Sequence, residues 1–370
     1  SNELKEINLK SNFLNNNTNF ENIKFNFKIL GSNTNYEQYV SKINNRLISF
    51  NPATMSKSLL ETDLVTIDYL NKNLKIRSGN YVVDQFYRIP KGYKLNVEDG
   101  VKIDFVKGGG IISYSTINLN GTKSNPIVIT SSDKHNKGLT LINTDEVSNF
   151  ENVMISNLSN YNSDNYNLTG ALTFYQSDVF IKQCVISNNI SGDDLVNIFK
   201  SNFEIIDSSF NNSLSDALDA DFCDGKIINS KFVQSGNDAI DISGTSLVIS
   251  KLLIDTAQDK ALSAGENSSI EGSEVTITFS EIGICSKDLS VINLNKFELI
   301  NNTIGITAFQ KKSKFGPGYL NLTNGTLKQN KIDFLVEKNS IAYLNNNILI
   351  PNNGNLKDQF YGVKYGKSSK

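Results

Sequence analysis

The stretch from Ser215 to Glu266 reads SDALDADFCDGKIINSKFVQSGNDAIDISGTSLVISKLLIDTAQDKALSAGE and contains one phrase three times. The copies are Asp216–Asp221, Asp238–Ser243 and Lys260–Gly265, and they begin 22 residues apart because 238 − 216 and 260 − 238 both equal 22. A strand phrase repeated at this period leaves no room for a helix between copies, which is typical of a parallel β-solenoid. This repeat decides the fold class.

The repeat continues on both sides of this stretch. Aligned copies begin with steps of 24, 22, 22, 22, 23 and 22 residues at Gly170, Asp194, Asp216, Asp238, Lys260, Gly283 and Gly305. Two further apolar runs follow each copy, separated by Asn-rich turns such as Asn188-Asn189, Asn211-Asn212 and Asn301-Asn302. Three strands per turn predict an all-β, right-handed parallel β-helix.

The repeat also divides the chain. We expect the β-helix to span residues 79–353 and residues 1–78 to form an N-terminal cap or small subdomain. Apolar spacing predicts short helices in this cap at Tyr36–Phe50 and Thr54–Tyr69. A cap is expected because a bare terminal turn exposes strand edges. Residues 354–370 are polar and basic and are expected to form a loose tail.

Apolar and polar residues alternate within each copy with a period of two. Leu218, Ile240, Leu262 and Cys285 are therefore expected inside, stacked as neighbours. Stacked strands lie about 4.8 Å apart, so the polar residues form columns. Five carboxylates fall on two neighbouring turns, with Asp194 on the turn before and Lys260 on the turn after: Asp216, Asp219, Asp221, Asp238 and Asp241.

Composition excludes several classes of protein. The chain has 36 basic and 38 acidic residues and a net charge of −2, which argues against bulk nucleic-acid binding. No run of about 18 apolar residues is present, so no membrane span is expected. Three scattered cysteines, at 184, 223 and 285, are read as small buried apolar residues, and the single histidine, His135, cannot build a histidine-based metal site.

The carboxylate columns predict a metal site. Like charges this close oppose ionisation, so a cation or partial protonation is needed, and oxygen ligands in this number suit Ca²⁺. The expected ligands are Asp194, Asp216, Asp219, Asp221, Asp238 and Asp241. The structural alternative is that these residues cap turns through the backbone.

Lys260 stands at the edge of this cluster. It is either the charge partner of Asp238 or a base that removes the C5 proton of a uronic acid, helped by a bound cation that lowers its pKa. A basic and aromatic group downstream suits an anionic sugar chain or is a solvated loop; its residues are Lys287, Lys311, Lys312 and Tyr319.

The stretch IPKGYKLNVEDGVKIDF at residues 89–105 and the phrases SDALD, GNDAID and DKALSAG carry a resemblance. Residues from about 80 to 350 resemble the bacterial parallel β-helix, or pectate-lyase-like, superfamily. In polygalacturonases the matching phrases carry an Asp, an Asp pair and a His. Here Asp216 and Asp238 match the first Asp and one of the pair, while Asn237 replaces the other carboxylate and Lys260 replaces the His. The same turns resemble calcium-dependent family 9 pectate lyases, which use an aspartate cluster and a lysine base.

The resemblance implies a secreted, periplasmic or cell-surface protein acting on an anionic, uronate-containing polysaccharide. Our prediction is calcium-assisted β-elimination with Lys260, Asp238 and Asp216 as catalytic residues, because Asn237 removes a carboxylate that inverting hydrolysis needs. The alternatives are a glycoside hydrolase using Asp216 and Asp238, a C5-epimerase, and a non-catalytic adhesin or tailspike-like solenoid with structural calcium. Sequence does not indicate the oligomeric state.

Overall fold

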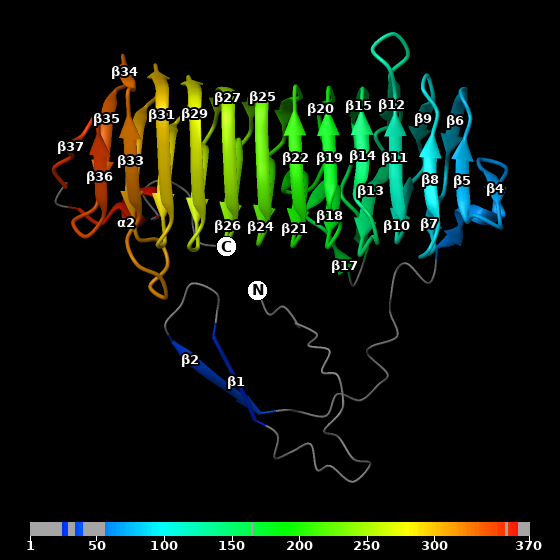
Figure 1. The fold of residues 1–370 in the computed structure, drawn as a ribbon, viewed down its shortest axis with the longest axis horizontal. Coiled ribbons are helices and arrows are strands. Elements are labelled where there is room, and N and C mark those ends of the chain that lie inside the picture. Colours follow the sequence, from blue (N-terminus) through cyan, green and yellow to red (C-terminus); the bar gives the residue numbers. More distant parts are fainter. Residues whose placement is uncertain (1–23, 29–33, 40–55, 164–165, 352–353, 362–370) are drawn as a thin grey trace.

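The computed structural model of the chain describes residues 24–28, 34–39, 56–163, 166–351 and 354–361. Most strands run side by side in successive turns of an elongated parallel β-helix (Figure 1). Parallel neighbours such as β21 (Asp194–Phe199) and β24 (Asp216–Asp221) belong to successive turns, so each turn contributes one strand to this sheet. The predicted all-β, right-handed parallel β-helix is confirmed.

One face of the β-helix is a sheet of 12 strands within the described residues. In spatial order they are β3 (Lys57–Ser58), β7 (Phe86–Ile89), β10 (Gly109–Ser113), β13 (Asn136–Ile142), β18 (Gly170–Tyr175), β21, β24, β26 (Ile240–Ser243), β28 (Lys260–Gly265), β30 (Ile282–Lys287), β32 (Ile304–Phe309) and β35 (Ile332–Val336). We call it the phrase sheet, because it holds every copy of the repeated phrase.

The other faces form a continuous sheet of 21 strands in the described part of the chain. Its strands are β4 (Thr66–Asp68), β5 (Asn73–Ile76), β6 (Asn80–Val83), β8 (Lys94–Val97), β9 (Lys102–Phe105), β11 (Thr116–Asn120), β12 (Ile127–Thr130), β14 (Ser148–Glu151), β15 (Val153–Ser156), β19 (Val179–Lys182), β20 (Val185–Ser187), β22 (Asn202–Ile206), β23 (Ser209–Ser213), β25 (Asp224–Ser235), β27 (Ser246–Ala257), β29 (Ser269–Thr278), β31 (Val291–Ile300), β33 (Tyr319–Thr323), β34 (Thr326–Lys328), β36 (Ile341–Leu344) and β37 (Asn347–Ile348). Two hairpins stand apart: β1 (Lys24–Lys28) with β2 (Asn35–Tyr39), and β16 (Asn162–Ser163) with β17 (Tyr166–Asn167).

The core runs along the inside of the solenoid as stacks of like residues. Leu218 pairs with Ile240, which pairs with Leu262, and all three are fully buried. Phe210 and Phe232 stack with ring centroids 4.6 Å apart. Because every turn repeats the same inward positions, apolar side chains from neighbouring turns meet and exclude water along the whole axis.

One stacked neighbour differs from the expectation. Leu262 pairs with Ile284, and Cys285 pairs with Ser263 in the outward column. The loop between β28 and β29 has one extra residue, since Ser246 pairs with Ser269, a step of 23 residues. The connection from β29 to β30, measured between paired positions, is one residue shorter than its counterpart in the preceding solenoid turn, so Lys260 pairs with Ile282 at a step of 22 residues. The alignment that placed Gly283 and Gly305 at the start of the phrase was therefore wrong by one residue.

The boundaries also differ from the sequence expectation. β3 already pairs with β7, and β5 pairs with β8, so solenoid strands begin before residue 79. Tyr36–Tyr39 belongs to strand β2, and residues 40–55 of the predicted helices lie outside the described residues. Within 56–69 only Leu59–Glu61 is helical, as the 3-10 turn η3, because strand pairing on both sides overrides the apolar spacing.

The predicted tail contains a short helix in its described part. Helix α2 (Leu356–Tyr361) packs on the outside of the phrase sheet, where Leu356 is buried with Ile282, Cys285, Ile304 and Phe309. The rings of Phe360 and Tyr361 lie 5.4 Å and 6.3 Å from the ring of Phe309. Residues 362–370 lie outside the described residues.

The Asn-rich turns behave as predicted. Asn188, Asn212 and Asn301 have φ values of 57°, 53° and 56°, in the left-handed region that asparagine tolerates better than most residues. Asn302 is buried, accepts the N–H of Ser280 and donates to the carbonyl of Ile277, so its amide replaces the missing strand partners at the corner. No helix among the described residues is long and apolar enough to span a membrane.

Candidate functional site: three columns on the phrase sheet

Stacking the repeated phrase places its polar residues in three columns on the phrase sheet. The first column is Asp194, Asp216, Asp238 and Lys260, at the beginning of each strand. The second column is Asn197, Asp219, Asp241 and Ser263. The third column is Phe199, Asp221, Ser243, Gly265 and Lys287. All six predicted metal ligands and the predicted base thus lie on, or two residues before, four neighbouring strands: β21, β24, β26 and β28.

The aspartates of the first column hold the backbone of the next turn. Asp216 accepts the backbone N–H of Asp238 at 2.8 Å and the side-chain amide of Asn237 at 2.7 Å. One turn later, Asp238 accepts the backbone N–H of Lys260 at 2.9 Å. Asp216 and Asp238 are only 8% and 2% exposed. Their geometry is that of buried caps, which corresponds to the structural alternative considered from sequence.

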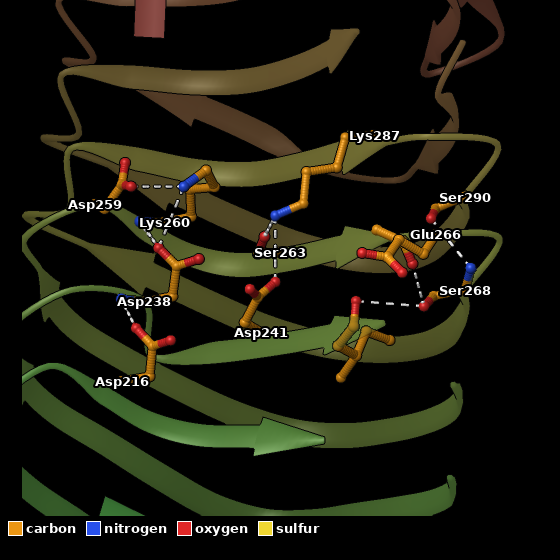
Figure 2. A network of polar contacts seen from close by, with 12 residues as sticks. Asp216, Asp238, Asp241, Asp259, Lys260, Ser263, Glu266, Ser268, Lys287 and Ser290 are labelled. Atoms are coloured by element: carbon orange, nitrogen blue, oxygen red, sulfur yellow. Dashed lines mark hydrogen bonds and ion pairs between the residues drawn. The ribbon is translucent and has the colours of Figure 1, made fainter. Parts of the chain in front are cut away.

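Lys260 is buried within an ion-pair cluster (Figure 2). Its Nζ lies 2.6 Å from Asp259 Oδ2 and 3.4 Å from Asp238 Oδ1, and 5.5 Å from the ring centroid of Tyr361. Burial favours the neutral amine, but Asp238, Tyr361 and Asp259 outweigh it and raise the Lys260 pKa well above its ordinary value. A lysine that keeps its proton and is 2% exposed is not placed to remove a proton from a polymer.

The second column is open to solvent where the first is closed. Asp219 and Asp241 are half-buried and pair directly across β24 and β26. Asn197 donates its side-chain amide to Asp219 Oδ2 at 3.0 Å. The ammonium group of Lys287 lies 3.3 Å from Asp241 Oδ1 and donates to Ser263 Oγ at 2.8 Å (Figure 2).

These surroundings shift the pKa values of the Asp219 and Asp241 carboxyl groups in opposite directions. Burial, together with the nearby charges of Asp194 and Asp221, raises the Asp219 pKa well above its ordinary value. Burial also opposes ionisation of Asp241, but Lys287 and Lys260 outweigh it and lower the Asp241 pKa. These opposite directions favour a proton on Asp219 and ionisation of Asp241. A neighbouring pair of titratable groups with opposite shifts is the arrangement of an acid and its partner base or nucleophile.

Gly265 makes the Lys287 contact possible. Lys287 lies in the third column, yet its side chain crosses towards Ser263 and Asp241 of the second column (Figure 2). A Cβ on Gly265 would lie 2.8 Å from Lys287 Cε, and the next nearest atoms are also in the Lys287 side chain. The missing side chain at position 265 thus leaves room for the lysine stem.

Two further carboxyl groups of the cluster, those of Asp216 and Asp194, also have raised pKa values. Burial and the neighbouring charges of Asp238 and Asp241 raise the Asp216 pKa to about 9, and burial raises that of Asp194 to about 7. Asp216, Asp238 and Asp241 already use an oxygen on backbone or lysine donors. Within the described residues, no group of three or more such side chains is placed to hold a metal ion. Calcium binding by the six aspartates stays a prediction.

The predicted substrate-binding residues separate. Lys311 lies 4.3 Å from the ring centroid of Tyr361, and Lys312 forms an ion pair with Glu266. Tyr319 is on β33 of the other sheet, where it pairs with Val291 and Ile341. Lys287 alone joins the second column, as the partner of Asp241.

Sequence reasoning missed the cover provided by α2 and the pairing of Lys287 with Asp241. The cover joins residues about a hundred positions apart, and no local pattern indicates it. The pairing had a signal in the repeat itself, because correct alignment places Lys287 directly after Gly265 in the third column.

Comparisons with known proteins give likenesses of structure alone. No family model and no curated protein match the chain. Among solved structures, the catalytic domain of a GH87 alpha-1,3-glucanase in complex with tetrasaccharides is 13% identical with a TM-score of 0.38; the match covers 74% of this chain and 64% of that one. The surface adhesin PfbA of Streptococcus pneumoniae is 11% identical with a TM-score of 0.27, covering 77% and 89%. Tailspike protein 3 of bacteriophage CBA120 is 10% identical with a TM-score of 0.21, covering 88% and 64%. By its own strand pairing, this chain is a parallel β-helix protein.

Proposed function

We propose that this β-helix hydrolyses a glycosidic bond at the second column, with Asp219 as the acid and Asp241 as its ionised partner. The observation that carries this proposal is the half-buried, directly paired Asp219 and Asp241, whose pKa values are shifted in opposite directions by named neighbours. Glycoside hydrolysis needs one protonated and one ionised carboxyl group on either side of the bond.

The register favours retention of configuration. Neighbouring strands lie about 4.8 Å apart, and paired side chains that extend in parallel would keep their carboxyl groups near that separation. This value is closer to the roughly 5–5.5 Å between carboxyl groups of retaining enzymes than to the roughly 6.5–9.5 Å of inverting ones. In the first step Asp219 protonates the leaving oxygen while Asp241 attacks the anomeric carbon and forms a glycosyl ester. In the second step Asp219 takes a proton from water, and that water releases the sugar from Asp241.

Lys287 supports this assignment chemically. Its ammonium group keeps Asp241 ionised before the attack, and Ser263 fixes the lysine by accepting a hydrogen bond. The aromatic rings of Tyr175 and Phe199 stack 4.9 Å apart at the other end of the third column, beside Asp221. They add a firm, partly apolar wall next to the reacting groups.

The elimination predicted from sequence would need another base, because Lys260 is buried and protonated. One assay separates the two chemistries. The protein is incubated with a panel of neutral and uronate polysaccharides, and reducing ends and the absorbance of unsaturated product are followed separately. New reducing ends without the absorbance, with the product anomer retained by NMR, are the expected result. Unsaturated product would overturn hydrolysis, and no product with measurable binding would favour the non-catalytic solenoid.

Calcium is proposed only as a stabilising ligand of the aspartate columns. A cation bound by the folded state alone raises stability by RT ln(1 + [L]/Kd). A thermal midpoint that falls on adding chelator and recovers with Ca²⁺ is the expected outcome. Identical melting curves with and without chelator, together with no heat of binding, would remove calcium from the proposal. The surface or extracellular location predicted from sequence likewise stays a prediction.

A further inference from the structure

A polar cavity of about 610 Å³ lies at the beginning of the strands that lead to the paired aspartates. Its walls come from the turn before β13 and from the segments before β18 and β21, including Thr169 and Asp193, which immediately precede those two strands. β21 is the direct neighbour of β24, which carries Asp219. At about 4.8 Å per turn, the cavity and the paired aspartates are a few strand spacings apart.

The charge of this cavity is unbalanced. Two lysines, Lys134 and Lys137, line it with a single carboxylate, that of Asp193, among the described lining residues. The ion pairs formed by the described residues include neither lysine. The ammonium group of Lys137 instead lies 5.5 Å from the ring centroid of Phe86 and 5.6 Å from that of Tyr161.

A second cavity on the other sheet provides a contrast. It has a similar size, about 630 Å³, but its lysines, Lys251 and Lys296, are matched by Glu274 and Glu298, and it is also lined by apolar residues. The cavity beside β13 is lined, apart from Leu168 and glycine, by charged residues and by amide and hydroxyl side chains. Such groups bind the hydroxyls of a sugar, and ammonium groups bind an acidic substituent.

Buried hydrogen bonds hold the walls of the cavity in place. Asn136 accepts the backbone N–H groups of Gly138 at 3.1 Å and Ser159 at 2.8 Å. Asn160 donates to the carbonyl of Leu168 at 2.6 Å and accepts from Ser191 at 2.7 Å. Gly138 has a φ of +67°, and a Cβ there would lie 2.3 Å from the carbonyl oxygen of Ser159. The cavity is therefore formed before any ligand binds, which lowers the entropy cost of binding.

We infer that this cavity is a binding subsite for an acidic sugar of the chain that Asp219 and Asp241 cleave. The inference rests on the proposed function and adds the place on the β-helix where a carboxylate group of the glycan would bind. It also assigns the binding of negatively charged groups to Lys134 and Lys137 in place of the lysines predicted from sequence. Lys287 and Lys312 are paired with Asp241 and Glu266, whereas Lys134 and Lys137 line a cavity in which Asp193 is the single carboxylate among the described lining residues.

The test measures binding apart from catalysis. Calorimetry at low ionic strength compares a galacturonate hexasaccharide, the same hexasaccharide with its carboxylates reduced to alcohols, and inorganic sulfate. Each is titrated into protein carrying Asp241→Asn, which stops turnover if the proposed function holds. The charge variant adds Lys134→Met and Lys137→Met, which keep the apolar stems. The matched control adds Lys251→Met and Lys296→Met in the balanced cavity.

We expect the acidic hexasaccharide to bind roughly tenfold or more tightly than the reduced one, and the charge variant to lose that advantage, since charge-assisted hydrogen bonds are the strong ones. The control substitutions, Lys251→Met and Lys296→Met, should leave the affinities for both hexasaccharides unchanged. Equal affinity for both hexasaccharides, or an unchanged charge variant, would overturn the inference. Sulfate binding as tight as that of the hexasaccharide would also overturn it, in favour of a free-anion site. Failure of the proposed function appears separately, as absence of turnover in the protein with Asp241 intact.

Discussion

Asp238 and Asp241 are three residues apart in one copy of the repeat, yet they have different environments and different roles. Asp238 is 2% exposed, caps the backbone of the next turn and forms an ion pair with the buried Lys260. Asp241 is half-buried, pairs with Asp219 across the two strands and forms an ion pair with Lys287, which Ser263 holds by accepting a hydrogen bond. The same residue type is structural in the first column and available for chemistry in the second.

The cause of the difference is the alternation of the strand. Asp216 and Asp238 have the same parity as the inward residues Leu218 and Ile240, whereas Asp219 and Asp241 have the outward parity. A carboxyl group that precedes or begins a strand at an inward-facing position is buried at the corner of the solenoid, where it accepts hydrogen bonds from backbone N–H groups. A carboxyl group with outward parity meets solvent and its copy one turn away.

The largest expected effect is on activity, from changes in the second column. Asp219→Asn and Asp241→Asn should each lower kcat about a hundredfold or more, because each removes an acid or its ionised partner. Reducing-end assays on folded variants, checked by circular dichroism, measure this loss. Azide should restore turnover to Asp241→Asn if that residue is the nucleophile. Normal rates in either variant would place the chemistry elsewhere.

The next effect is on stability, from the first column. Lys260→Met leaves Asp238 and Asp259 buried without their cation, and removing one partner of a buried ion pair costs about 3–5 kcal/mol. Urea denaturation measures this loss in free energy of unfolding. The control is Lys226→Met, which breaks an exposed pair with Glu204 and should cost at most about 1 kcal/mol. A Lys260→Met protein with unchanged stability and lost activity would reverse the roles of the two columns.

A smaller effect is expected from pH. The Asp216 pKa is raised to about 9 in the folded protein from an ordinary value of 3.8, so between about pH 4 and 9 unfolding releases its proton and stability falls as pH rises. Its facing groups are Asp194, Asp238 and Asp241. Asp216→Asn cannot ionise, so relative to wild type it should gain at least about 1 kcal/mol, the equivalent of one pKa unit, between pH 4 and pH 8. Thermal unfolding across this range measures the gain, and parallel curves would contradict it.

The smallest effect concerns the link between the third and second columns. Gly265→Ala should displace the Lys287 stem, weaken the contact with Asp241 and let the Asp241 pKa return towards its ordinary value. The acidic limb of the pH–rate profile should then move up by less than about one pH unit, with stability nearly unchanged. Lys287→Met, which removes the charge outright, should shift the limb further in the same direction. An unmoved limb in both variants would separate Lys287 from the chemistry.

The architecture follows from the repeat in the sequence. A strand with period-two alternation that recurs every 22 residues buries its apolar face by stacking on its own copies. The repeat therefore predicted the β-helix, the stacking of Leu218, Ile240 and Leu262, and the carboxylate columns. The misalignment of the last two copies, which affects Gly283, Cys285 and Gly305, followed from one extra residue in the loop between β28 and β29 that the shorter connection between β29 and β30 compensates. Neither connection length is visible in the repeated strand phrase.

Which column is accessible, and which groups each charged side chain contacts, follows only from the folded chain. Helix α2, some hundred residues after Lys260, covers that lysine with Tyr361, and the stem of Lys287 passes over Gly265 to reach Asp241. Both contacts join residues whose separation in the chain carries no periodic signal. Protonation depends on burial and on charges a few ångströms away, so the assignment of acid, partner and buried cap to particular aspartates appears only when the turns are stacked and covered.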